Sequence, residues 1–272
     1  MKQPSLAVSA VRILDLSFGE MLWSRRSIFL GLVVGGPVVL AVVIRIVSAS
    51  FGALQINGEG VGGGALFGMT IWILYIRFII PVLGVFYGTS LIADEVDDKT
   101  ITYLFTRPIP RSAVLFGKYL AYLACTVLLI LPSVVLVYLL LAPIGGSLGA
   151  AFPALLEDLA MLAIGLAAYG ALFAYVGARM KRPLVTGLVF AFGWEPAVLL
   201  FPGYLKRLTV AYYLQALVPH AMPEDSAIRV LMQVFREVPS VWASVASLAV
   251  IIGLALWAGG RAVETREYVL EQ

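Results

Sequence analysis

The sequence predicts an all-α, polytopic membrane protein, and three observations support that prediction. First, 61% of the 272 residues are hydrophobic and only 13% are charged, with a mean hydropathy of +0.97. A water-soluble domain of this length carries far more polar surface. Second, several apolar runs reach about 20 residues, which matches the hydrocarbon thickness of a bilayer. Third, these runs are unbroken and do not alternate as barrel strands do, so we expect helices that satisfy their own backbone hydrogen bonds.

One transmembrane domain is expected over residues 1–272, and its elements follow in order. Residues 5–26 place apolar side chains at helical spacing with charged residues opposite them, which predicts an amphipathic helix at the membrane surface. Its apolar positions are Val8, Val11, Leu14, Phe18, Met21 and Leu22. Six apolar segments follow, and we expect each to cross the membrane. They lie at about 27–47, 72–93, 112–142, 159–178, 183–202 and 238–260.

The basic residues predict which side of the membrane is cytoplasmic. Six crossings put both termini on one side, and 13 of the 19 bases fall in segments on that side. Four more fall in the loop between the last two crossings, while Arg45 and Arg77 fall within crossings. Because cytoplasmic segments are enriched in Lys and Arg, both termini are predicted to be cytoplasmic. The net charge of +3 is too small and too scattered to indicate nucleic-acid binding.

A charged loop at 94–111 interrupts the apolar sequence on the predicted cytoplasmic side. Asp94 is a suitable N-cap for a short helix, and Glu95 stands four residues before Lys99 in the favourable order. The helix would end at Arg107, because the residue before a proline avoids helical geometry. One face of this helix is apolar, formed by Ile101, Leu104 and Phe105. Two interpretations remain open: a solvated turn, or a docking element for a cytosolic partner.

The order of residues in and after this loop resembles the ABC-2 type transporter permeases. The matching positions are Glu95, Thr100, the stretch RPIPR at 107–111, and Gly117 with Lys118; Lys99 departs from the glycine of many members. In such permeases the short helix, called the coupling helix, docks in a cleft of a separate ATP-binding subunit. The resemblance implies ATPase coupling by one set of residues in this chain. They are Glu95, Thr100, Ile101, Leu104, Phe105, Arg107, Arg111 and Lys118.

The resemblance also implies the assembly and the location of the protein. We expect an exporter of the bacterial inner membrane, a homodimer of this chain with two ATP-binding subunits that hold ATP and Mg²⁺. This chain is not expected to be an enzyme, because LFGK at 115–118 lacks the upstream glycine and the Ser or Thr of a phosphate-binding loop. No metal or cofactor of its own is expected, since His220 is the single histidine and Cys125 the single cysteine.

Two ionisable residues inside predicted crossings, Arg77 and Glu195, are candidates for function. A charge costs roughly 2.5–3.5 kcal/mol at the centre of a membrane helix, so it requires a reason to be there. Three uses are open for Glu195: an ion pair with Arg77, which we favour, a polar pathway, or a break at Pro196 that turns the chain. The apolar sequence of 201–239 predicts interfacial or re-entrant helices before the last crossing, and the resemblance suggests that they form an outer gate.

Two other functions remain as alternatives. A membrane enzyme or a non-transport assembly subunit would need a cluster of catalytic side chains at one membrane depth, and the scattered acids provide none. An ion-coupled secondary transporter usually contains an internal repeat with matched broken helices, and we find no such repeat. No residue pattern specifies the cargo.

Overall fold

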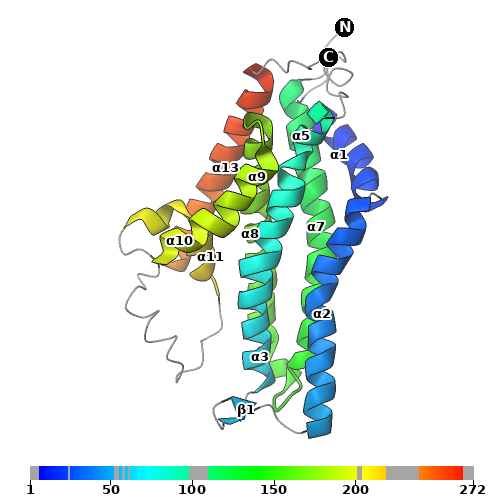
Figure 1. Ribbon diagram of the computed structural model, residues 1–272, viewed down its shortest axis with the longest axis vertical. Coiled ribbons are helices and arrows are strands. Elements are labelled where there is room, and N and C mark those ends of the chain that lie inside the picture. Colours follow the sequence, from blue (N-terminus) through cyan, green and yellow to red (C-terminus); the bar gives the residue numbers. More distant parts are fainter. Residues whose placement is uncertain are drawn as a thin grey trace.

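A computed structural model describes residues 6–23, 25–51, 55–56, 59–60, 62–97, 110–200, 204–218 and 239–265 of the chain. Over these residues the protein is a bundle of long helices with one two-stranded hairpin, β1 (Gln55–Ile56) and β2 (Glu59–Gly60) (Figure 1). Five helices of the described part are long and apolar enough to cross a membrane. They cover Ile28–Ser50, Gly63–Val96, Arg111–Leu141, Leu148–Arg179 and Val241–Thr265.

The chain begins with α1 (Leu6–Trp23) and α2 (Arg25–Phe51), and its second crossing is a composite helix. This composite contains α3 (Gly63–Thr70), η1 (Ile71–Ile79), α4 (Ile80–Leu83), η2 (Gly84–Gly88) and α5 (Ser90–Asp97). The third and fourth crossings are the uninterrupted helices α7 (Arg111–Leu141) and α8 (Leu148–Arg179), and the last is α13 (Val241–Thr265). Between α8 and α13 lie shorter elements. They are α9 (Pro183–Leu188), η3 (Val189–Trp194), α10 (Glu195–Leu200), η4 (Tyr204–Leu208) and α11 (Val210–Gln215).

The helix ends gather at two ends of the bundle. At one of them α5 ends, α7 begins, α8 ends, α9 begins and α13 ends (Figure 1); we call this the α5–α7 end. At the opposite end α2 finishes, α3 begins, and the chain turns from α7 into α8. There the backbone N–H of Gly63 donates to the carbonyl oxygen of Ile144 at 2.6 Å, which ties the start of the second crossing to the α7–α8 turn.

The second crossing contains two π-helical stretches, η1 and η2, and a third, η3, follows α9. Two of the three end just before a proline: η1 ends two residues before Pro81 and η3 two residues before Pro196. Proline has no backbone N–H and its ring crowds the carbonyl one turn earlier, so the preceding turn widens. These wide turns therefore follow from the sequence.

The centre of the bundle is the close contact between α8 and the second crossing. A Cβ atom on Gly177 would lie 2.3 Å from the carbonyl oxygen of Thr89, so only glycine permits this approach. Helix α7 is fixed to α8 by two tyrosines, because the hydroxyls of Tyr119 and Tyr122 donate to the backbone oxygens of Ala167 and Leu166 at 3.0 and 3.2 Å. The three helices thus form one packed unit.

Three of the predicted crossings differ from the structure. The second was expected at 72–93, but its helix covers Gly63–Val96. The fourth was expected at 159–178, but α8 begins at Leu148 and includes Asp158, a fully buried acid. The fifth was expected as a full crossing at 183–202, but Pro183–Val198 is only a short apolar helix. About 16 residues of helix rise roughly 24 Å, less than the roughly 30 Å of a bilayer core. The expectation of six full crossings is therefore not met by the described residues.

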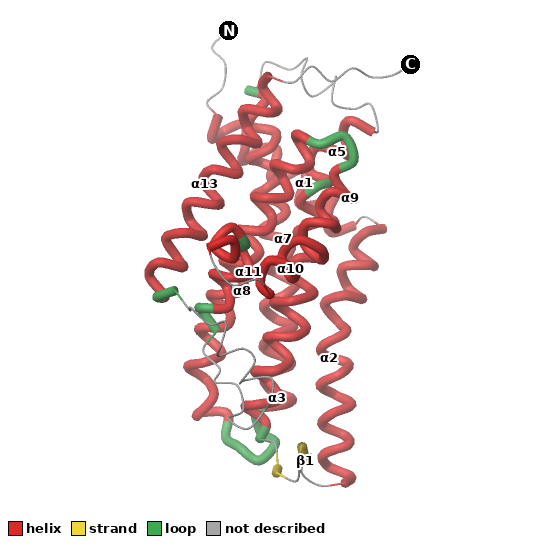
Figure 2. The backbone as a smooth tube through the Cα atoms, turned by 60° about the vertical axis from the view of Figure 1, so that its left-hand side comes forward, coloured by secondary structure: helices red, strands yellow, loops and turns green. Residues whose placement is uncertain are grey.

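After this short helix the chain turns back into the bundle instead of continuing to the opposite end (Figures 1 and 2). Helix α11 packs against α8, α13 and η1, with Val210 and Leu214 buried. Lys206 and Thr209, just before α11, are buried as well. Helix α11 is thus packed within the protein, whereas most of η4 is exposed, including Tyr204 and Leu208. The rest of the segment between the last two crossings, with Ile228, Leu231, Met232 and Phe235 and the His220 loop, lies outside the described residues.

Candidate functional site

The residues predicted to couple to an ATPase fall into two groups. Thr100, Ile101, Leu104, Phe105 and Arg107 lie outside the described residues, so the helix proposed for them is not part of the fold described above. Glu95, Arg111 and Lys118 are described: Glu95 lies near the end of α5, Arg111 opens α7, and Lys118 lies two turns into α7. The two helices that flank residues 98–109 therefore both carry candidate residues.

Glu95 and Lys118 form an ion pair between α5 and α7. The Nζ of Lys118 donates to the Oε1 of Glu95, and both side chains are largely buried. The lysine neutralises the largely buried carboxylate of Glu95. Loss of one partner of such a pair strongly destabilises the protein, because the other charge remains buried without a counter-charge.

The structure corrects the predicted role of Asp94. We expected it to cap a new helix, but Asp94 lies inside α5, which continues the second crossing through Asp97. The change from apolar to charged sequence at residue 94 marks the end of the apolar surface and not the end of the helix. The acids near residue 95 consequently extend the second crossing beyond its apolar part.

Helix α1 crosses α7 beside the ion pair. A Cβ atom on Gly117 would lie 2.7 Å from both the carbonyl oxygen of Ala10 and the Cβ of Ile13, so the two helices touch backbone to backbone. This contact gives α1 a buried face that the sequence did not predict. Its buried face is the line of small side chains and one isoleucine, Ser9, Ala10, Ile13 and Ser17, while the predicted apolar positions Val8 and Val11 are exposed. Helix α1 is therefore part of the bundle at the α5–α7 end.

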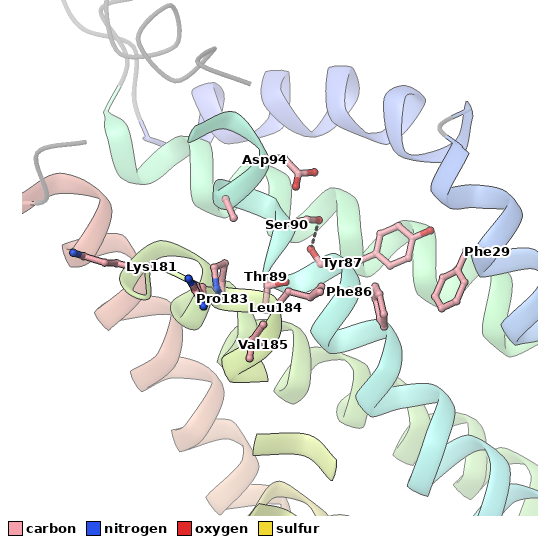
Figure 3. A pocket seen from close by; sticks show the side chains of 12 residues that line it. Phe29, Phe86, Tyr87, Thr89, Ser90, Asp94, Lys181, Pro183, Leu184 and Val185 are labelled. Atoms are coloured by element: carbon pink, nitrogen blue, oxygen red, sulfur yellow. Dashed lines mark hydrogen bonds between the residues drawn. The ribbon is translucent and has the colours of Figure 1, made fainter. Parts of the chain in front are cut away.

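A groove of about 620 Å³ opens near the same end, between α2, the second crossing and the α8–α9 turn. Figure 3 shows Phe29 of α2 facing Phe86, Thr89 and Ser90, with Leu184 and Val185 of α9 below and Lys181 at the far rim. The rings of Phe29 and Phe86 are in contact, with centroids 5.0 Å apart. The groove is apolar inside and charged at its edge.

Glu195 belongs to a second polar cluster, inside the bundle. Its carboxylate accepts hydrogen bonds from the hydroxyl of Tyr169 on α8 and from the backbone N–H of Val210, the latter at 2.9 Å. The side chain is only 3% exposed, so these donors replace the water that the charge has lost. Through Glu195, the end of the short fifth segment holds the first turn of α11 against α8.

The favoured ion pair between Arg77 and Glu195 is not formed. Among the described residues the guanidinium of Arg77 lies over the ring of Trp72, 4.7 Å from its centroid, and its buried Nε has no hydrogen-bond acceptor. The two charges still interact through space. The break expected at Pro196 is not formed either, because the helix continues through Pro196 to Leu200; the carboxylate of Glu195 instead fastens the start of α11 where the chain re-enters the bundle.

Sequence reasoning missed three residues of these sites: Tyr169, Gly117 as a crossing point, and Asp158. A signal was present for Asp158, because it follows Leu155 by three residues and precedes Leu162 by four, which places it on the buried face of one helix. No comparable signal exists for Tyr169. Its partner is 26 residues away, and the periodicity of one helix does not specify which helix faces it.

No group of three or more His, Cys, Asp or Glu side chains that could hold a metal ion occurs in the part of the chain that the structure describes. Cys125 is a free thiol buried in α7. The chemistry that the described residues offer is therefore that of ion pairs and hydrogen bonds between helices.

Comparison with known proteins gives one finding. The sequence model of a family described as "ABC-2 family transporter protein" matches residues 19–194, well over half of the chain. The match includes α2, the second crossing, α7, α8 and the first part of the short fifth segment. None of the curated proteins matches the chain.

Proposed function

Because this chain belongs to the ABC-2 transporter family, as a multi-pass membrane permease, we propose that it exports its cargo using ATP hydrolysed by separate subunits. Two copies of the chain form the transport route, and an ATP-binding subunit docks on each copy at the α5–α7 end. ATP and Mg²⁺ are held by those partners. The α5–α7 end faces the cytoplasm of a bacterial cell, as the distribution of basic residues predicts.

The observation that carries this proposal is the Glu95–Lys118 ion pair. It joins the two helices between which residues 98–109 run, so a force applied to those residues acts on α5 and α7 together. A loop between two unconnected helix ends would instead absorb the movement of a docked partner. Because of the ion pair, movement of the proposed docking segment is transmitted to both helices.

The packing of α7 provides a route by which this movement reaches the rest of the bundle. Tyr119 and Tyr122, one and four residues after Lys118, bond α7 to α8. On its other side α7 contacts α1 at Gly117. A shift of α5 and α7 therefore displaces α8 and α1 as well, and alternating access is a rigid-body change of this kind.

The proposal assigns docking to the apolar face of Ile101, Leu104 and Phe105, supported by Thr100, Arg107 and Arg111. Ile101, Leu104 and Phe105 supply apolar area for the cleft of the partner, and the flanking charges orient the segment. Glu95 and Lys118 act as positioning residues, because they fix the segment to the membrane part without touching the partner.

Charge reversal at the ion pair tests this assignment. We expect Glu95→Lys to uncouple transport from ATP hydrolysis and Glu95→Lys/Lys118→Glu to restore much of the coupling, because the pair is rebuilt with its signs exchanged. The assay is permease-dependent ATP hydrolysis and cargo efflux in proteoliposomes containing both subunits. Phe105→Asp should instead abolish co-purification of the ATP-binding subunit, and no second change at residue 95 should restore it.

Normal coupling in Glu95→Lys and in Phe105→Asp together would show that this end of the bundle is not the docking site. A permease that moves cargo in vesicles with no nucleotide hydrolase present would contradict the proposed energy source. It would favour an ion-coupled transporter.

A further inference from the structure

The groove beside α9 is built from two kinds of surface, which lie at different places. Its interior is formed by aromatic and aliphatic side chains, among them Phe29, Phe86, Leu184 and Val185. Its edge carries Lys181 and Arg182 from the α8–α9 turn and Asp94 from α5. A ligand that fits both parts has an apolar body and a charged head, which is the composition of a membrane lipid.

The hydroxyl groups of Ser90 and Thr89 do not supply the donors for an anionic head. Ser90 donates to the carbonyl oxygen of Tyr87 at 2.9 Å, and Thr89 donates to that of Val85 at 2.6 Å. A hydroxyl has one hydrogen to donate, so both are already used within their own helix. Lys181 and Arg182, which are exposed at the rim, are the cationic donors of the groove.

The charges at the edge indicate the class of head group. Two bases and one acid sum to one positive charge, which complements a head group with one negative charge better than a zwitterionic one. Asp94 in addition favours a head that carries hydroxyl groups, because a carboxylate accepts hydrogen bonds at several lone pairs. Basic pockets between membrane helices on the cytoplasmic side are suited to anionic lipid heads.

We propose that this groove binds one anionic phospholipid of the phosphatidylglycerol type. Its phosphodiester lies on Lys181 and Arg182, its glycerol head lies near Asp94, and its acyl chains run along Phe29, Phe86 and Leu184. The residues of this lipid site are separate from the docking segment of the proposed function. The site places an anionic lipid against α5, one residue from Glu95, and so beside the helix pair that the ion pair joins.

Native mass spectrometry of the purified full-length permease tests the site. The protein is titrated with phosphatidylglycerol, phosphatidylethanolamine and phosphatidylcholine, and retention of each lipid is measured. Lys181→Ala/Arg182→Ala should weaken binding of phosphatidylglycerol by about 25-fold, since each base near a membrane surface contributes about fivefold. Leu184→Trp, which fills the groove without changing charge, should reduce binding as well.

Arg179→Ala is the matched control. Arg179 is an exposed base of the same turn that does not line the groove, and its removal should leave binding within about twofold of the wild type. The proposal is overturned if Arg179→Ala and Lys181→Ala/Arg182→Ala weaken binding equally, because the effect is then that of surface charge alone. It is also overturned if the three lipids bind equally, or if Val185→Cys forms a disulfide between two copies, since a second copy then covers the groove.

Discussion

At the scale of single residues, the surroundings of Glu195 supply hydrogen-bond donors to its buried carboxylate. Tyr169 and the N–H of Val210 donate to its two oxygens, and the side chain is almost fully buried. A buried carboxylate that accepts such bonds is tolerated inside a helix bundle, whereas a buried carboxylate without donors lowers the stability of the fold. Removing the acid therefore leaves two buried donors without an acceptor.

We expect Glu195→Ala to lower the free energy of unfolding in detergent by about 3 kcal/mol, because each unsatisfied donor costs about 1–3 kcal/mol. Tyr169→Phe should cost about 1.5 kcal/mol, and the double variant should cost less than the sum of the two. Thermal unfolding followed by circular dichroism measures all three. Glu157→Gln, at an exposed acid of the same region of α8, is the control and should stay within about 0.5 kcal/mol of the wild type. Additive costs would show that the Tyr169–Glu195 bond contributes nothing.

A second residue-scale feature joins three helices in one chain of hydrogen bonds. The hydroxyl of Ser133 on α7 donates to the carbonyl oxygen of Val34 on α2 at 2.8 Å. Its hydrogen is thereby used, so at the 2.7 Å contact with Tyr75 the tyrosine is the donor. Tyr75 of η1, Ser133 and α2 are thus connected in a fixed direction.

Ser133→Ala should destabilise the protein more than Tyr75→Phe does. The serine variant leaves the Tyr75 hydroxyl without its acceptor and also removes the bond to the Val34 carbonyl, at about 2 kcal/mol, while the phenylalanine variant removes one net bond, at about 1 kcal/mol. Urea or thermal denaturation of the two variants compares them directly. Equal costs would mean that the bond from Ser133 to Val34 contributes nothing to stability.

The sequence predicted part of this residue-scale chemistry. Glu195 was identifiable because an acid within an apolar run stands out against its neighbours, and Arg77 for the same reason. Their partners were not identifiable, since Tyr169 and Trp72 are ordinary amphipathic side chains in apolar helices. The nearest opposite charge was expected to be the partner, but a phenol and a backbone amide satisfy Glu195 instead.

At the scale of elements, the crossing of α1 over α7 depends on the absence of a side chain at one position. Gly117→Leu should push α1 away from α7, because even a Cβ at this position meets the backbone of Ala10 and the side chain of Ile13. We expect faster cleavage in α1 by added protease and at least a severalfold loss of ATPase coupling. Gly35→Ala is the control, since nothing lies within 4 Å of a Cβ there. Unchanged cleavage of α1 in Gly117→Leu would show that the crossing is loose.

The elements show where periodicity and apolar length succeed and where they fail. Predicted crossings at 27–47 and 112–142 coincide closely with α2 and α7, because long apolar runs with charged or proline-containing flanks define both ends. The start of α8 was missed because Glu157 and Asp158 lower the local hydropathy, although helical spacing continues through them. The fifth segment was overestimated because hydropathy measures apolar length and does not register that the chain re-enters the bundle at α11, soon after α10.

At the scale of the whole molecule, the arrangement of helix ends makes a topological prediction that labelling can test. Cys125 is the single cysteine and is buried, so Cys125→Ala provides a background without reactive thiols. In that background Lys181→Cys should react with a membrane-impermeant maleimide only when the cytoplasmic side is accessible. Ser147→Cys, exposed at the turn between α7 and α8, should react in intact cells. The reverse pattern would place the α5–α7 end outside the cell and contradict the proposed docking site.

Composition and segment length predicted the helical membrane class of the whole molecule, and the order of residues around Glu95 suggested the family. How α1, α5 and α7 meet was not predictable, because it depends on contacts between segments more than 20 residues apart. Gly117 and Lys118, adjacent in sequence, make two of these contacts: one holds α1 and the other holds α5. A pattern of one helix alone contains no information about such a shared contact.

The wide turns of the second crossing affect which changes of sequence this helix can accept during evolution. A π-helical turn accommodates one residue more than an α-helical turn, and each added residue rotates the following side chains by about 100°. With η1 and η2 in the same helix, side chains near Gly63 and near Asp97 follow different angular phases, so one helical wheel cannot describe both. A deletion of one residue within Ile71–Ile79 is then accommodated when the wide turn tightens to α-helical geometry. During evolution the direction of the Trp72 side chain can therefore change while Glu95 keeps its position.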